Sequence, residues 1–128
     1  MKFGWTIVYV ADVAASLQFW EAAFGFSRRF ASEDGTYGEL ATGETTIAFA
    51  ARSMAAAAGV AVEFPEPGRI APGVELALTT DDVPGAFARA VAAGAVAVKE
   101  PAVMSWGQTV SYVRDLDGVL VEICSPVE

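Results

Sequence analysis

Two glutamates set in apolar, strand-like stretches are the side chains in this sequence best placed for binding or catalysis. Glu75 opens the run Glu-Leu-Ala-Leu-Thr, and Glu122 lies in Val-Leu-Val-Glu-Ile-Cys. Side chains two apart in a strand share a face, so each glutamate sits on a mixed face and the opposite face is purely apolar. A carboxylate in such surroundings needs a partner, a proton or a ligand. Alternatively, Glu75 is solvent-exposed at the start of its strand. Glu122 is alternatively an exposed strand residue or the ion-pair partner of Arg114.

Aromatic rings supply a second kind of contact. Trp5 and Tyr9 share a face of the first apolar stretch, and Trp106 lies in a Ser-Trp-Gly loop, where a large ring is costly to expose. Such rings stack on flat or cationic ligands. Trp5 is alternatively a core residue, whereas Trp106 is expected either to cover the binding face as a lid or to pack at a subunit contact.

The sequence lacks the residues that several common catalytic and metal sites require. The chain contains no histidine and a single cysteine, Cys124. A Ser/His/Asp triad, a histidine-activated thiol and a Cys/His zinc cluster are therefore ruled out. Neither a phosphate-binding glycine loop nor a dinucleotide fingerprint occurs, and we expect no cofactor.

The net charge and the hydropathy limit the classes of molecule that the protein is expected to bind. Sixteen acidic and eight basic residues give a net charge of −8, which disfavours nucleic acid and anionic membranes and favours cationic small molecules, unless the acidity serves solubility alone. No apolar run approaches the roughly 18 residues that span a bilayer. We interpret residues 3–10 as a strand rather than a signal peptide, and a single cysteine fits a cytoplasmic protein.

The elements that must position these residues occur twice. Residues 5–10 predict a strand, and Asp12 then caps a helix whose apolar residues Val13, Leu17, Trp20 and Phe24 recur at helical spacing up to Gly25. Strands follow at 26–31, 36–41 and 45–50. After an offset of 70 the pattern returns: a strand at 74–80, an N-cap at Asp82, a helix up to Gly94, and strands at 96–99, 109–114 and 119–124.

The repeat predicts one domain of 128 residues built from two βαβββ modules, at about 1–51 and 74–128. The intervening 52–73 has an alanine-rich helical stretch at 53–58 and a loop rich in proline and glycine, and it reads as a linker. A linker of this length favours modules that pair across chains, in a homodimer.

Local motifs agree with a known family. They are Val10-Ala-Asp12 before a Ser-Leu-x-Phe-Trp helix ending in Phe24-Gly-Phe26, Ala93-Gly94, Trp106-Gly-Gln108, and Asp115-Leu-Asp-Gly-Val-Leu-Val-Glu122. The chain thereby resembles the vicinal oxygen chelate superfamily, which includes glyoxalase I, bleomycin-resistance proteins and extradiol dioxygenases; Leu116 stands where the family usually has proline. The resemblance implies an α+β fold in which two paired βαβββ modules form a curled, cup-shaped mixed sheet with helices outside.

The same resemblance places the family's four metal-ligand positions on Trp5, Ala48, Glu75 and Glu122, of which only the glutamates are acidic. We therefore expect no metal, and a binding protein like the bleomycin-resistance branch, which confers antibiotic resistance by sequestering a drug. The expected ligand is aromatic and cationic, and it contacts Trp5, Tyr9, Ala48, Glu75, Trp106 and Glu122. The alternative is a metal-dependent enzyme of the glyoxalase type, a lactoylglutathione lyase-like lyase, an isomerase or a dioxygenase, with Glu75 and Glu122 as its metal ligands.

Overall fold

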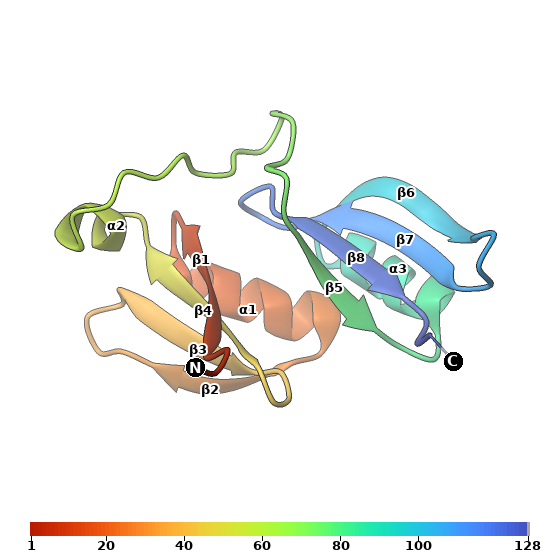
Figure 1. Ribbon diagram of the computed structural model, residues 1–128, viewed down its shortest axis with the longest axis horizontal. Coiled ribbons are helices and arrows are strands. Elements are labelled where there is room, and N and C mark those ends of the chain that lie inside the picture. The colour runs from red at the N-terminus through yellow and green to blue at the C-terminus, as the bar shows by residue number, and fades with distance from the viewer. Residues whose placement is uncertain (128) are drawn as a thin grey trace. The chain divides into compact units, whose positions relative to one another are not determined.

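The computed structural model describes residues 1–127, in two compact units. Unit 1 is Met1–Phe64, and unit 2 begins at Pro65. Figure 1 shows the elements in chain order. They are β1 (Trp5–Val10), α1 (Val13–Phe24), β2 (Ser27–Ala31), β3 (Tyr37–Ala41), β4 (Thr46–Ala51), α2 (Ser53–Ala57), β5 (Glu75–Thr79), α3 (Val83–Ala92), β6 (Val96–Val103), β7 (Thr109–Arg114) and β8 (Leu120–Cys124).

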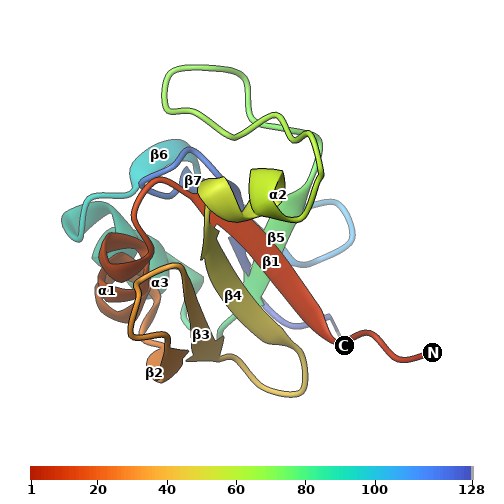
Figure 2. The ribbon, with the colours of Figure 1, turned by 90° about the vertical axis from the view of Figure 1, so that its left-hand side faces the viewer.

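Unit 1 is a mixed sheet covered on one face by α1. The strand order is β1-β4-β3-β2, with β1 and β4 parallel and the other pairs antiparallel; Figure 2 shows this order. Asp12 caps α1 by accepting a hydrogen bond from the Ala15 N–H at 3.1 Å, and Gly25 ends it at φ 78°. Trp20 is fully buried and its ring lies 5.6 Å from that of Phe49. The N-cap, the stop and the apolar stripe are thus confirmed.

Unit 2 repeats this plan. Its sheet has the order β5-β8-β7-β6, and Asp82 caps α3 through the Gly85 N–H at 3.0 Å. The two βαβββ modules are confirmed, and the fold is α+β with two four-stranded mixed sheets. None of the helices in residues 1–127 is long and apolar enough to cross a membrane.

The main departure from the predicted elements is β6. It runs to Val103, whereas the sequence predicted its end at Lys99. The strand contains Pro101 and two register irregularities, and it tolerates them because it lies at the edge of its sheet and needs no ladder on its outer side.

The segment between the modules is attached to both units. The Phe64 ring lies 6.1 Å from that of Tyr9 and 5.1 Å from the Arg52 guanidinium, so residues up to 64 pack on unit 1. Arg114 then donates hydrogen bonds to the carbonyl oxygens of Glu66 and Arg69, which ties the next residues to unit 2.

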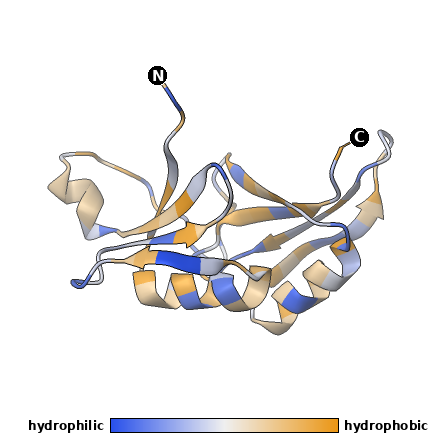
Figure 3. Cartoon of the chain, turned by 90° about the horizontal axis from the view of Figure 1, so that it is seen from below, coloured by the Kyte–Doolittle hydropathy of each residue, from blue (hydrophilic) through white to orange (hydrophobic). Residues whose placement is uncertain are grey.

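Each sheet has one face that carries no helix. In Figure 3 the helices α1 and α3 each run along one side of the sheet of their own unit. In unit 1, a Cβ on Gly38 would come within 2.6 Å of Leu17 beneath it, so Gly38 faces α1 and its neighbours face the other way. We call the second side the helix-free face. Strand register puts on it Trp5, Ile7, Tyr9, Tyr37, Glu39, Thr46 and Ala48 in unit 1, and Glu75, Ala77, Tyr112, Leu120 and Glu122 in unit 2.

Candidate functional site

The helix-free face of unit 2 brings Glu75 and Glu122 together around one phenol. Tyr112 lies directly across from Glu122 in the β7–β8 ladder, and its hydroxyl donates a hydrogen bond to Glu122 Oε1 at 2.8 Å. Glu75 lies on the neighbouring strand β5, where Ala77 pairs with Glu122. The three side chains therefore form a cluster of two acids and one phenol, the Tyr112 cluster.

The two acids repel each other. Partial burial and the charge of Glu122 raise the pKa of Glu75, and a hydrogen bond with Tyr112 opposes that rise. The hydrogen bond to Glu122, burial and the charges of both acids raise the pKa of Tyr112 to about 12. The phenol therefore remains a hydrogen-bond donor at neutral pH.

Cys124 borders this cluster but is not activated. Its side chain is buried and its sulfur lies 3.6 Å from the Leu78 carbonyl oxygen. Burial, with smaller effects from Glu122 and Glu75, raises the pKa of the thiol to about 11. The thiol is thus protonated at neutral pH and a poor nucleophile.

No basic side chain neutralises the two glutamates. Within residues 1–127, neither Glu75 nor Glu122 has a lysine or arginine nitrogen within the 4.0 Å of an ion pair. The alternative that Arg114 pairs with Glu122 is wrong, because all three guanidinium nitrogens donate to backbone carbonyls, among them that of Gly118 at 2.8 Å.

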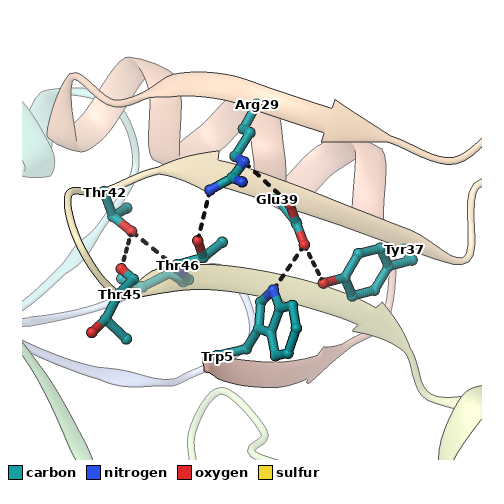
Figure 4. A network of polar contacts seen from close by, with 8 residues as sticks. Trp5, Arg29, Tyr37, Glu39, Thr42, Thr45 and Thr46 are labelled. Atoms are coloured by element: carbon teal, nitrogen blue, oxygen red, sulfur yellow. Dashed lines mark hydrogen bonds and ion pairs between the residues drawn. The ribbon is translucent and has the colours of Figure 1, made fainter. Parts of the chain in front are cut away.

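Unit 1 has a different cluster on its helix-free face, centred on Glu39 (Figure 4). Glu39 Oε2 accepts hydrogen bonds from the Trp5 indole N–H at 3.0 Å and from the Tyr37 hydroxyl at 2.6 Å. Its Oε1 lies 3.6 Å from Arg29 Nε, and Arg29 also donates to the Thr46 hydroxyl at 3.1 Å. This carboxylate has its partners within the protein, and its side chain is only 14% exposed.

The other predicted site residues of unit 1 differ in what they offer a ligand. The Trp5 side chain is held by Glu39 but remains 56% exposed, which leaves ring surface for stacking. Ala48 is buried directly across from Glu39, and the Tyr9 ring packs against Phe64. Of the two predicted aromatic residues of unit 1, Trp5 therefore offers a ligand the more accessible ring.

Trp106 does not join the Tyr112 cluster. It lies in the turn between β6 and β7, beside Gln108 and near Ser125, which follows the last residue of β8. Glu75 begins β5 and pairs with the first residue of β8, so the two residues lie at opposite ends of this sheet. A lid over Glu75 and Glu122 is not the role that this position supports.

Sequence reasoning missed Glu39, Arg29 and Tyr112 as site residues. Tyr112 could have been found from the sequence, because it lies in a strand, 109–114, that is joined by an Asp-Gly turn to the strand of Glu122 and is therefore predicted to pair with it. Arg29 could not, because it comes to this face at a register irregularity between Arg28 and Phe30.

The family metal site does not fit these residues. The resemblance places two of the ligand positions on the indole of Trp5 in β1 and the methyl group of Ala48 in β4, and neither side chain offers a donor atom to a metal. Within residues 1–127, no three or more His, Cys, Asp or Glu side chains gather as a metal cluster would require. No reaction step through a metal follows from this donor set.

The two βαβββ modules define a fold of the two-module glyoxalase type. Residues 2–123 match the Glyoxalase/Bleomycin resistance protein/Dioxygenase superfamily, and the chain belongs to this family. No curated protein sequence matches the chain significantly.

Solved structures agree on the fold. A glyoxalase-related enzyme from Fulvimarina pelagi is 23% identical, with a TM-score of 0.82, and the match covers 98% of this chain and 88% of that one. A protein of unknown function from Agrobacterium tumefaciens is 24% identical at a TM-score of 0.79, with 98% and 94% covered. A glyoxalase/bleomycin resistance protein/dioxygenase family enzyme from Burkholderia phytofirmans is 19% identical at a TM-score of 0.78, with both chains fully covered.

Proposed function

We propose that this protein binds a small cationic, aromatic molecule without a metal, and that the Tyr112 cluster holds the positive charge. The observation that carries the proposal is the pair Glu75 and Glu122, two acids around one phenol with no basic partner within residues 1–127. A ligand cation relieves their repulsion and gains two charged contacts. The Tyr112 ring adds a surface to which a cation is attracted.

Unit 1 offers a stacking surface of its own in Trp5. The Glu39 carboxylate fixes the indole N–H, so the ring loses little further freedom when a flat molecule stacks on it. In unit 1 the Glu39 carboxylate accepts from two donors and lies beside Arg29, whereas in unit 2 Glu75 and Glu122 share one phenol and have no basic partner within residues 1–127. We propose sequestration, as in the bleomycin-resistance branch, as the use of this binding.

A binding comparison tests the proposal. Benzyltrimethylammonium and benzenesulfonate, two aromatic ions of opposite charge, are titrated at low salt by calorimetry. We expect the cation to bind more tightly, and Glu122→Gln to weaken its binding by about 1 to 3 kcal/mol, the range for losing a charged hydrogen-bond partner. Equal or tighter binding of benzenesulfonate would refute the proposal.

Two variants serve as controls. Glu33→Gln removes the same charge from an exposed loop of unit 1 and reports the effect of net charge alone. Tyr112→Phe keeps the ring and removes the hydroxyl that orients Glu122. This variant should therefore weaken the binding of the cation less than Glu122→Gln does. If Glu33→Gln weakens binding as much as Glu122→Gln, the site lies elsewhere.

The second candidate is a metal-dependent lyase, isomerase or dioxygenase in which Glu75 and Glu122 bind the metal. It is favoured by the closeness of these two carboxylates, which oxygen-seeking cations tolerate, and opposed by Trp5 and Ala48 at the other two positions. Elemental analysis separates the two candidates.

We also propose that the protein is a homodimer. The long segment 52–73 between the modules allows the first module of one chain to pair with the second module of the other. Sedimentation equilibrium at micromolar concentration tests this, and a monomer mass would contradict it.

A further inference from the structure

A hollow of about 450 Å³ lies at one end of the unit 2 sheet, away from the Tyr112 cluster. It lies beyond the end of β5 that is opposite Glu75, and the five residues of β5 span about 13 Å at roughly 3.3 Å per residue. We call it the Trp106 hollow. Its lining residues are Asp81, Trp106, Gly107, Gln108, Ser125, Pro126 and Val127.

The turn that carries Trp106 is closed by hydrogen bonds. The Met104 N–H donates to the Gln108 carbonyl at 2.8 Å, and the Gly107 N–H donates to the Met104 carbonyl at 2.9 Å. Gly107 has φ 93°, a left-handed conformation that a residue with a side chain rarely adopts. The turn is therefore defined by its own backbone.

The indole is held in one orientation. Its N–H donates to Gln108 Oε1 at 2.8 Å, and Gln108 Nε2 in turn donates to the Ser125 carbonyl at 2.8 Å. The residue is nevertheless 65% exposed. A ring fixed through its only polar atom, with its apolar surface in water, is a preorganised platform for stacking.

Asp81 supplies a negative charge to the lining of the hollow. The adjacent Asp82 is occupied as the N-cap of α3, whereas the Asp81 carboxylate makes no hydrogen bond or ion pair within residues 1–127. No lysine or arginine lines the hollow. Asp81 therefore adds a negative charge to a lining that holds no basic residue.

We propose that the Trp106 hollow is a second binding site of unit 2, which takes an alkylated ammonium group. Such a group is attracted to the face of an indole and to a carboxylate at once, and its methyl groups remove apolar ring surface from water. The hollow has the volume of a small-molecule site. This inference does not rest on the proposed function, because the Trp106 hollow shares no residue with the Tyr112 cluster.

The test uses choline and its neutral isostere 3,3-dimethylbutan-1-ol. In ¹⁵N-labelled protein the three tryptophans give three indole N–H signals, and Trp106→Phe identifies that of Trp106. We expect choline to shift the Trp106 signal saturably, and the alcohol to bind at least threefold more weakly. Asp81→Asn should weaken the binding of choline at least threefold. Glu33→Gln, which removes one charge from unit 1, should leave this binding unchanged.

The outcomes are distinct. Equal binding of choline and the alcohol, or equal effects of Asp81→Asn and Glu33→Gln, would overturn the site. An unchanged Trp106 signal in the absence of choline shows that unit 2 of the Asp81 variant is folded. In the Glu122→Gln variant the Trp106 signal should still shift with choline. The experiment therefore distinguishes a failure of the Tyr112 cluster as a binding site from a failure of the Trp106 hollow. A choline response that disappears in Glu122→Gln would assign the binding to the Tyr112 cluster and refute the second site.

Discussion

Glu39 and Tyr112 occupy the same place in the two units. Each lies on the third strand of its module, directly across from a residue of the last strand, which is Ala48 for Glu39 and Glu122 for Tyr112. Each unit thus keeps one carboxylate in this cross-strand pair, on the third strand in unit 1 and on the last strand in unit 2. In unit 1 the Glu39 carboxylate has hydrogen-bond donors and an arginine beside it, whereas in unit 2 Glu75 and Glu122 have no basic partner within residues 1–127.

The first prediction concerns Glu39. Glu39→Ala should lower the free energy of unfolding by about 1 to 2 kcal/mol, because the Trp5 indole and the Tyr37 hydroxyl both lose their acceptor in a partly buried place. Urea denaturation measures the loss. Glu33→Ala, an exposed loop residue, is the matched control and should change stability by less than about 0.5 kcal/mol. Equal stability of the two variants would show that the Glu39 cluster contributes nothing to folding.

The second prediction concerns alkaline pH. Tyr37 and Tyr112 each have a pKa of about 12 in the folded protein, against an ordinary value of 10.0. As the pH rises from 10 to 12, the unfolded chain releases these protons while the folded protein keeps them. Their contribution to stability is therefore complete below pH 10 and is lost as the pH rises through 12.

Denaturation at a series of pH values checks this. The free energy of unfolding should fall between pH 10 and 12, and Tyr37→Phe and Tyr112→Phe should each reduce the fall. Other alkaline groups titrate alike in all three proteins, so the differences belong to the two phenols. An unchanged fall in the double variant would contradict the prediction.

Much of the fold is predictable because its signals are local. Asp12 and Asp82 cap their helices through the next turn of the backbone, and Gly25 adopts the left-handed conformation that ends α1. The repeat after 70 residues adds a second, independent reading of the same unit. The extension of β6 through Pro101 escaped, because only its place at a sheet edge permits a proline there.

The candidate site is less predictable because its contacts are between strands. Strand period places Glu122 on a mixed face, but only the β7–β8 register shows that the residue opposite it is Tyr112. Arg114 has a plausible charge for pairing with Glu122, yet it lies beside the backbone carbonyls of Glu66 and Gly118. Such a choice between a carboxylate and carbonyls depends on the path of the linker, which the sequence does not encode locally.

The third prediction concerns metal content. Purified protein should hold no stoichiometric zinc, nickel, manganese or iron, because Trp5 and Ala48 supply no ligand and two carboxylates alone bind such ions weakly. Elemental analysis after dialysis measures it. One full equivalent of metal that is absent from a Glu75→Gln/Glu122→Gln variant would contradict the prediction and favour the metal-dependent alternative.

The last prediction concerns the linker at Arg69. Arg114 donates a hydrogen bond to the Arg69 carbonyl, which belongs to the peptide bond between Arg69 and Ile70, and a second one to the Glu66 carbonyl at 3.2 Å. Trypsin recognises Arg69, and Ile70 is 98% exposed, so this bond is accessible and yet held in place. Arg114→Ala removes the hold, and we expect cleavage at this bond to accelerate several-fold, because a protease must draw the segment into an extended form. Arg28→Ala, which removes only the surface pair with Glu21 at 2.9 Å, is the control and should leave the cleavage rate unchanged. Mass spectrometry of the fragments identifies the bond, and equal cleavage rates in wild type and Arg114→Ala would show that Arg114 does not fix the linker.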